Sequence, residues 1–498
     1  MADHFISRRQ AESDLLSAAA FLAENIKSSD GHAEAMKVII PRFLAKGEVD
    51  LAAELSNAID DPFVRDRLLI GVAESCASLD DVEYGLQLAD AIEDHGMQEQ
   101  ARERMALVRA GKGDSAAASE IAEMMTHPDY VYAGIAVNQA SLGNDAGADA
   151  ALEQIEFSSA AVSAFEHIAA AHIEKGSLET AVVAIERGIE AADEIEHDEE
   201  RLRALCNLGE QLVEAKRNDK AITTFDHARD MAESLDNFHR EYFLVACALG
   251  FLNAGSEELS SRALDLVTDK TQMASALLAI SRKEWKEEKK DVAAETLDEA
   301  YAIIRSQRDF ETRDSRTRNG VMAAIAADFA IIGQTERAVE VAQENPDPAE
   351  ETAALVRIAS TLAQRNEGDE YQAAVRAIKD DADRMSAFVI IADAKAESGD
   401  DTSAVALLDE AVSMAETVPQ LSARSNALTD IALRFFELGQ PDRTRAICEE
   451  VFSVIAEIRD ESSQAVALVN LASVYETTGL GLNETELGRI RSLTNRVD

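Results

Sequence analysis

The chain has 498 residues, 94 of them acidic and 48 basic, so its formal net charge is −46. That charge excludes a nucleic-acid scaffold that holds phosphates through basic patches. Hydrophobic residues make up 46% of the chain and aromatic residues only 5%, which favours a folded chain with a core of Ala, Leu, Ile and Val. Few Lys among many Asp and Glu are typical of proteins that work in concentrated salt, with an acidic mesophilic protein as the alternative.

We expect the first segment, residues 1–30, to form a capping helix around the apolar patch from Leu15 to Leu22, because a terminal repeat needs one polar face. It has no apolar stretch of signal-peptide length, and no run of about 18 apolar residues occurs in the chain. The sequence therefore predicts a cytoplasmic protein without membrane contact. The cysteines are predicted to be reduced core residues because none has a metal-ligand or CxxC spacing; they are Cys76, Cys206, Cys247 and Cys448.

From about residue 31 onward, apolar residues recur at intervals of three and four, which predicts one amphipathic helix after another. No Val-, Ile- or aromatic-rich stretch with two-residue alternation indicates a strand, so the predicted fold class is all-α. A unit recurs in which an Ile or Leu precedes a small residue, a turn follows eight residues after the Ile or Leu, and a small residue opens the next helix. Ile168-Ala169 with Gly176 and Ala181 is one example.

Sliding this register along the chain places thirteen turns, with a mean spacing of about 36 residues. Most steps are 33 residues and several are 39 or 40, and we expect the two helices of the pair to share the extra turns. The predicted turns are Gly47, Asp80, Gly113, Gly143, Gly176, Lys216, Gly255, Glu288, Gly333, Asn366 to Gly368, Gly399, Gly439 and Gly479. A turn Gly is favoured because a left-handed residue ends the helix there.

The units resemble tetratricopeptide repeats in their order of large and small residues. The best match has Leu208, Gly209, Leu212, Ala221, Phe225 and Ala228 at the consensus positions; the signature Trp and Pro are mostly missing, so the repeats are degenerate. The resemblance covers roughly residues 31 to 495 and implies a right-handed α-solenoid of about 12–13 stacked helical hairpins. We expect a first solenoid segment at 31–302 and a second at 321–498 that ends in a C-terminal cap.

The connection between these segments, residues 303–320, is expected to be irregular. Basic and acidic residues balance from Arg282 to Arg318, in a chain that is otherwise strongly negative. The connection is interpreted as a solvated hinge, with a partner-docking patch as the alternative.

No motif for nucleophilic, nucleotide or zinc-hydrolase chemistry occurs in the sequence. The closest metal-like group is Glu166, His167 and His172, but a five-residue His spacing puts the two rings on different faces of a helix. The acidic stretch from Glu196 to Glu200 lacks the alternating carboxylates and the Gly of a calcium loop. We therefore expect no catalytic residue, no cofactor and no metal site, and we expect that the chain is not an enzyme.

In repeats of this kind the first helix of each unit lines the concave surface, so the resemblance implies a partner-binding groove. The candidate groove residues are Leu249, Leu252, Arg282, Trp285, Lys286, Val389, Leu433 and Phe436. Trp285 is the strongest candidate, because a Trp beside two cations, Arg282 and Lys286, has the composition of a binding hot spot. The alternative is that these side chains simply pack against neighbouring helices.

The functional hypothesis is a non-catalytic scaffold or adaptor that holds an unidentified protein partner, as a peptide or helix, in its concave groove. A second hypothesis is a structural protein that self-assembles by stacking its solenoid ends, favoured by the apolar Leu482 and Leu487 in the last helix. A third is a regulatory sensor whose pitch responds to a ligand. Neither nucleic acid nor membrane is an expected partner, and a homo-oligomer is left open.

Overall fold

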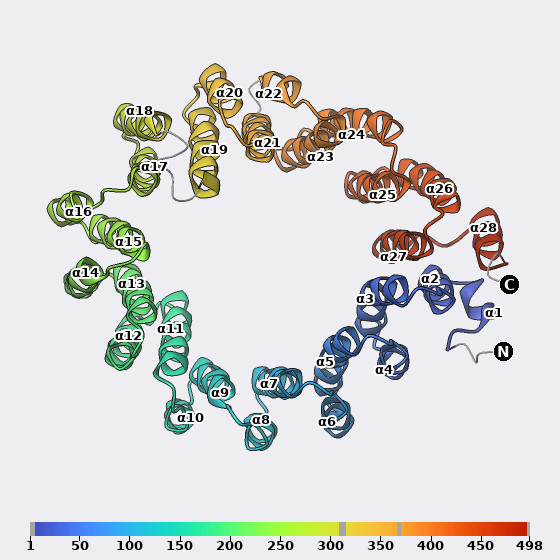
Figure 1. The fold of residues 1–498 in the computed structure, drawn as a ribbon, viewed down its shortest axis with the longest axis horizontal. Helices are drawn as coiled ribbons and strands as arrows, with labels where there is room; N and C mark the ends of the chain where they lie inside the picture. The colour runs from blue at the N-terminus through green and yellow to red at the C-terminus, as the bar shows by residue number, and fades with distance from the viewer. Residues whose placement is uncertain (1–4, 308–314, 366–369, 496–498) are drawn as a thin grey trace. The chain divides into compact units, whose positions relative to one another are not determined.

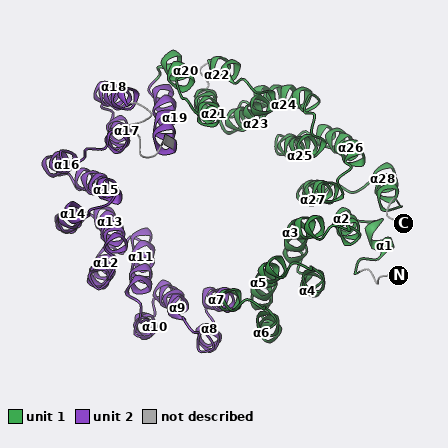
Figure 2. Cartoon of the chain, in the orientation of Figure 1, with its two compact units in different colours: residues 1–101, 333–498 green, residues 102–332 purple. Residues whose placement is uncertain are grey.

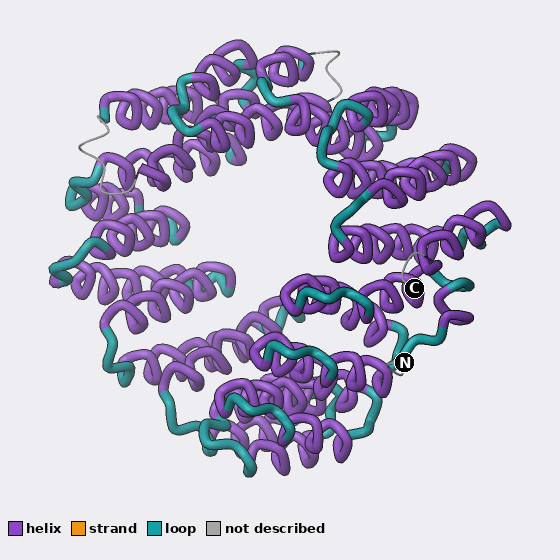
Figure 3. Tube along the Cα trace, turned by 45° about the vertical axis from the view of Figure 1, so that its right-hand side comes forward, coloured by secondary structure: helices purple, strands orange, loops and turns teal. Residues whose placement is uncertain are grey.

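The computed structural model describes residues 5–307, 315–365 and 370–495, and within these ranges every regular element is a helix (Figures 1 and 3). The helices follow one another as hairpins, so the predicted all-α helical repeat fold is confirmed. The chain divides into two compact units, residues 1–101 with 333–498, and residues 102–332 (Figure 2). Part of the predicted connection at 303–320 and the predicted turn at 366–368 lie outside the described residues.

Unit 1 contains both ends of the chain. Its helices are α1 (Arg8–Ala11), α2 (Leu15–Glu24), α3 (Ser29–Ala45), α4 (Val49–Asn57), α5 (Pro62–Ser78), α6 (Val82–Asp90), α20 (Thr335–Gln343), α21 (Pro348–Gln364), α22 (Tyr371–Ala377), α23 (Asp381–Glu397), α24 (Asp401–Ala415), α25 (Leu421–Glu437), α26 (Pro441–Glu457), α27 (Glu461–Thr478) and α28 (Glu484–Thr494). Proline opens α5, α21 and α26, where a missing N–H costs no helical hydrogen bond.

Unit 2 holds the middle of the chain, and the boundary between the units falls inside α7 (His95–Gly111). Its other helices are α8 (Ser115–Ala122), α9 (Asp129–Ser141), α10 (Asp145–Leu152), α11 (Ser158–Glu174), α12 (Leu178–Asp193), α13 (Asp198–Glu214), α14 (Asn218–Ser234), α15 (His239–Asn253), α16 (Glu257–Leu264), α17 (Lys270–Lys286), α18 (Lys290–Ser306) and α19 (Ser315–Ile331).

Within each unit the first helices of neighbouring hairpins pack directly on one another, as in α9, α11, α13, α15 and α17. The second helices pack on their own first helix, and some, such as α4, α12 and α14, also pack on the next first helix. Figure 1 shows the resulting two layers, with the odd-numbered helices from α9 to α17 on one side and the even-numbered helices on the other.

The turn prediction is confirmed wherever it can be checked. All twelve predicted turn residues in the described ranges have a positive φ, and nine of them are glycines. Asp80, Lys216 and Glu288 adopt the same left-handed conformation with φ of 66°, 60° and 63°. For these three the conformation carries a steric cost that Gly avoids.

The prediction that both helices share the extra turns of the longer repeats is wrong. First helices keep similar lengths, such as 17 residues in both α5 and α13. The second helix has 9 residues in α6 and 8 in α10, but 16 in α12 and 17 in α14. The extra turns lie in the second helix because it belongs to the outer layer, where lengthening does not disturb the packing between first helices.

Small residues on the first helices let the helices of neighbouring hairpins pack closely. Phe225 of α14 is fully buried between the backbones of Gly209 in α13 and Gly250 in α15. A Cβ atom at Gly209 would lie 2.7 Å from the Phe225 ring, and one at Gly250 would lie closer still. The Phe225 ring also meets Phe251 edge-on, with centroids 5.9 Å apart. One aromatic side chain thus joins three helices of two successive hairpins.

Three hairpins with a short second helix, those of α6, α10 and α16, share a feature that the sequence did not predict. Near the start of their first helix, a carboxylate accepts two backbone N–H groups from the linker that follows the second helix. Asp129 accepts from Glu156 at 2.6 Å and from Phe157 at 2.9 Å. Asp66 and Glu241 make the same pair of bonds with linkers 27 and 28 residues later. The carboxylate ties the linker to the first helix and satisfies N–H groups that have no helical partner.

A second kind of linker contact follows the long helices α12 and α26 and also the short helix α22. A side chain on the next first helix donates a hydrogen bond to a carbonyl six residues earlier, just beyond the end of the second helix. Arg201 donates to the Ile195 carbonyl at 2.9 Å, and Gln464 donates to the Ile458 carbonyl at 3.2 Å. Here a side chain of the next first helix satisfies an acceptor in the linker, whereas Asp66, Asp129 and Glu241 satisfy donors in theirs.

Candidate functional site

The predicted groove residues divide between the two units. Leu249, Leu252, Arg282, Trp285 and Lys286 lie on α15 and α17 of unit 2, and Val389, Leu433 and Phe436 lie on α23 and α25 of unit 1. All eight lie on first helices, as the repeat register requires. Most of these side chains are half-buried, Lys286 is exposed, and Val389 is buried with 8% of its surface accessible. Val389 therefore contributes to packing more than to an open surface.

Arg282 is bound to its own chain. Its Nε and Nη2 donate to the two carboxylate oxygens of Asp328 in α19 at 2.5 and 3.1 Å. Asp328 is buried, so the bidentate pair holds α17 against α19. An Arg fixed in this way can position its neighbours but offers few donors to a partner.

Trp285 lies at the C-terminal end of α17 and is half-buried. The ammonium of Lys290, at the start of α18, lies 5.2 Å from the centroid of the Trp285 ring. This cation–π contact closes the turn between the two helices. The Trp285 ring is thus partly covered by a cation of its own chain, and part of the ring remains accessible.

One cavity of unit 1 lies across α23, α25 and α27, and the predicted groove residue Leu433 is part of its lining. Its volume is about 720 Å³. Its lining comprises Ala382, Asp383, Met385, Ser386, Val418, Ala423, Asn426, Ala427, Thr429, Asp430, Leu433, Asn470 and Ser473. Amides, hydroxyls and carboxylates thus surround a few apolar side chains, and no Lys or Arg is among the lining residues.

Polar contacts across the first helices fix the geometry of this cavity. Asn470 of α27 donates to the side-chain oxygen of Asn426 in α25 at 2.9 Å. Arg434 pairs with Asp430 on its own helix and donates to Asp393 of α23 at 3.4 Å. Burial raises the pKa of Asp393, and the Arg434 guanidinium opposes that rise. Polar side-chain contacts therefore join the successive first helices beside the cavity.

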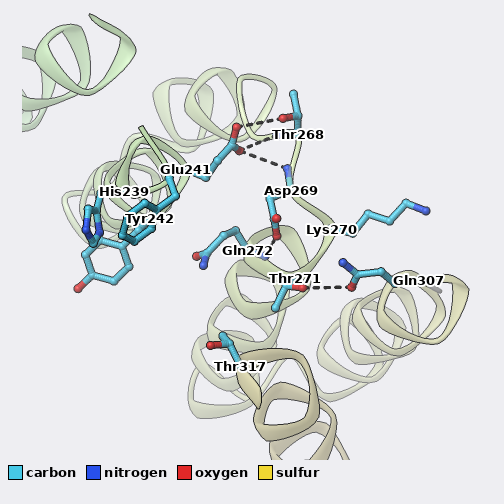
Figure 4. Close-up of a pocket in the computed structure, with 11 residues that line it drawn as sticks. His239, Glu241, Tyr242, Thr268, Asp269, Lys270, Thr271, Gln272, Gln307 and Thr317 are labelled. Atoms are coloured by element: carbon cyan, nitrogen blue, oxygen red, sulfur yellow. Dashed lines mark hydrogen bonds between the residues drawn. The ribbon is translucent and has the colours of Figure 1, made fainter. Parts of the chain in front are cut away.

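A second cavity, of about 520 Å³, lies where α15, α17 and α19 of unit 2 begin (Figure 4). The carboxylate of Glu241 is turned toward Thr268 and Asp269 and is occupied by their N–H groups, and Thr271 donates to Gln307 at 3.1 Å. Phe238 and Tyr242 also line the cavity and are 69% and 53% exposed. The internal bonds occupy much of the polar lining, which leaves these two rings as its accessible apolar surface.

The sequence analysis missed Phe238 and Tyr242 because their position at the start of a first helix lies outside the register used for the groove. A signal was present: two aromatic residues occur within five positions of each other in a chain with only 5% aromatic residues. In a chain so poor in aromatic residues, rings placed on the surface instead of in the core mark a candidate contact surface.

The described residues contain no group of three or more His, Cys, Asp or Glu that could hold a metal ion. All four cysteines are free and buried. Burial raises the pKa of the Cys76 thiol to about 11 and that of Cys448 to about 12, which disfavours the reactive thiolate. A search of the same residues finds no helix long and apolar enough to cross a membrane.

No family model matches the chain, and no curated protein matches it. Yeast Tom70 is similar to it at 14% identity over 90% of this chain and 97% of that chain, with a TM-score of 0.28. A signal transduction ATPase with a tetratricopeptide repeat sensor, from Pyrococcus horikoshii, has 11% identity over 97% and 87% of the two chains, with a TM-score of 0.26. A circular tandem repeat protein has 15% identity over 97% and 96%, with a TM-score of 0.14. At these values the likeness carries no information on function.

Proposed function

We propose that the chain is a non-catalytic scaffold that binds a segment of a partner protein on the layer of first helices. The observation that carries this proposal is the cavity over α23, α25 and α27, because it combines the groups that an extended peptide needs. Asn426, Asn470 and Ser473 offer hydrogen bonds to a peptide backbone, and Leu433 offers an apolar contact.

The charge of the cavity indicates which segment it would prefer. Asp383 and Asp430 are among its described lining residues, which include no basic residue, although Arg434 pairs with Asp430 from the same helix. The chain as a whole carries a net charge of −46, so an acidic partner would be repelled. We infer a segment with an apolar anchor residue flanked by Lys or Arg, bound by apolar contact and hydrogen bonds where salt screens the charges.

Peptide display on the full-length protein tests the proposal. We expect selected peptides to share an apolar residue flanked by basic residues, and we expect Leu433→Asp to abolish their capture because the apolar contact is lost. Leu142→Asp is the matched control, since Leu142 is 68% exposed in unit 2 and lies outside this cavity. Equal capture by both variants, or selected peptides without a shared pattern, would contradict the proposal.

The second cavity gives the same function a separate test in unit 2. Tyr242→Ala removes an accessible ring, whereas Trp285→Ala removes the hot spot predicted from the sequence. Loss of capture with the first substitution alone would place the contact at the cavity of Figure 4. Loss with the second alone would place it at the groove residues of α17.

Stacking of free solenoid ends, the second hypothesis, is not favoured by the structure. Helices from the two ends of the chain pack on each other within unit 1: α2 and α3 contact α27, and α1 contacts α28. The apolar faces of the terminal hairpins are therefore already covered. No observation favours the ligand-responsive sensor over the scaffold.

A further inference from the structure

Helices α13 and α15 of unit 2 approach each other closely where each carries a glycine. A Cβ atom at Gly209 in α13, or at Gly250 in α15, would lie within 2.7 Å of the same atom of the Phe225 ring, Cε1. The two Cβ positions are therefore no more than twice that distance apart. The chain turns back at each end of α14, so α13 and α15 run in the same direction. Residues one turn earlier on the same two faces consequently come opposite each other as well.

A cysteine occupies that earlier position in each helix. Cys206 lies three residues before Gly209 in α13. Cys247 lies three residues before Gly250 in α15, so the two cysteines have the same separation along the chain as the two glycines. A hydrogen bond between the two thiols, together with burial, raises the pKa of Cys247 well above its ordinary value. Two successive hairpins thus contribute one thiol each to a single pair.

The two thiols differ in their access to solvent. Cys247 is completely inaccessible, whereas 8% of the surface of Cys206 is exposed. Arg229, one turn beyond Phe225 in α14, lies close enough to Cys247 for its charge to favour the thiolate there. A small oxidant therefore meets Cys206 first, and Cys247 stands beside it with a cation that supports its reaction.

We propose that Cys206 and Cys247 form an oxidation site, at which a peroxide joins α13 to α15 through a disulfide. Oxygen from the peroxide adds to the Cys206 sulfur as the O–O bond breaks, which gives a sulfenic acid and water. The Cys247 sulfur then attacks the Cys206 sulfur. The S–S bond forms, the S–O bond breaks, and the hydroxide leaves as water with the Cys247 proton. The two thiols lose two electrons in total, and the peroxide takes them up.

The close approach at the glycines is the geometry that such a bond needs, because a disulfide requires Cα atoms about 6 Å apart. The bond would fix the spacing between two neighbouring first helices, which non-covalent packing alone sets in the reduced chain. The cavity proposed to bind a peptide lies on other helices, in unit 1. The oxidation site and the scaffold function can therefore be tested, and can fail, independently.

Peroxide treatment of the folded, full-length protein is the first test. The chain has four cysteines, all free, so we expect the titratable thiols to fall from four to two. Peptide mapping without reductant should then show the peptides of Cys206 and Cys247 joined. Hydrogen exchange should slow in α13 and α15 and stay unchanged in α23 and α25. Four remaining thiols, oxidation of Cys206 without a link, or a link to Cys76 or Cys448 would overturn the proposal.

Variants separate the two chemical steps. With Cys247→Ser the sulfenic acid at Cys206 has no thiol to react with, so a dimedone probe should label it more strongly than in the parent. The double variant C76S/C448S is the matched control, because it keeps the pair and should form the disulfide as fully as the parent does. A disulfide that forms only after unfolding in denaturant, or equal labelling of Cys206 in the parent and in Cys247→Ser, would show that the folded chain does not place the two thiols for reaction.

Discussion

Hairpins α9/α10 and α13/α14 of unit 2 have the same order of turn and helices but differ in the second helix, which has 8 residues in one and 17 in the other. The long helix places Phe225 between two glycines of the neighbouring first helices. In the short hairpin the equivalent residue, Leu152, is half-buried, and Asp129 holds the exit linker by hydrogen bonds. The long hairpin is thus stabilised by apolar packing and the short one by a buried carboxylate.

The largest expected effect comes from removing the apolar contact that distinguishes the long hairpin. We expect Phe225→Ala to cost about 3–5 kcal/mol, because it leaves a cavity between α13, α14 and α15. Leu152→Ala, at the matching position of the short hairpin, should cost about 1 kcal/mol because that side chain is already half accessible. Hydrogen exchange of peptides from α9 to α15 measures both losses, and equal losses would show that the two hairpins are stabilised alike.

The next effect is the loss of the carboxylate that distinguishes the short hairpin. Asp129→Ala should cost about 2–3 kcal/mol, because the N–H groups of Glu156 and Phe157 lose the charged acceptor that the buried Asp129 provides. Exchange protection should fall first in α10 and the linker after it. Asp145→Ala, on the exposed first turn of α10, is the control and should change stability by no more than about 0.5 kcal/mol.

A smaller change in stability is expected from substitutions at the turns, which both classes of hairpin share. Lys216 ends α13 with φ 60°, a conformation that Gly adopts without steric cost. We expect Lys216→Gly to stabilise the hairpin by about 1 kcal/mol, and Gly176→Ala, at a turn with φ 75°, to destabilise its own hairpin by a similar amount. The denaturation midpoint, measured at one salt concentration, should therefore move in opposite directions in the two variants.

The turns and the packing of small residues could be predicted from the sequence because each depends on a local constraint that repeats at fixed spacing. A left-handed turn favours Gly, and a close crossing of helices needs Ala or Gly. The length of the second helix could not be assigned, since a 40-residue step allows several divisions of the extra turns. The pairing of α2 with α27 escaped prediction because it joins residues more than 400 positions apart, where no spacing applies.

The candidate site was less predictable for a related reason. The register correctly placed all eight residues on first helices, but it could not show that Arg282 is bound by Asp328, 46 positions away. Nor could it show that Val389 is buried by its neighbours. Whether a side chain on a first helix is accessible depends on partners from the hairpins before and after it, so accessibility follows from the stacking of repeats.

The smallest expected effect on stability comes from Glu166 in α11. This residue lies in the layer of first helices, where the two classes of hairpin do not differ. Burial between α11 and α13 raises the pKa of Glu166 above its ordinary 4.5, and a hydrogen bond from Asn207 partly offsets the rise. The folded state therefore takes up a proton at a higher pH than the unfolded state does, so at neutral pH the ionised carboxylate opposes folding.

We accordingly expect Glu166→Gln to be slightly more stable than the parent at neutral pH. Its advantage should shrink as the pH falls through the raised pKa and vanish below about 4.5, where the carboxyl is protonated in both states. Denaturation midpoints across this range test the sign, with the exposed Glu174→Gln on the same helix as the control. An advantage that grew on acidification would show that Glu166 is stabilised as the anion, and that the first-helix layer accommodates charge more readily than its burial indicates.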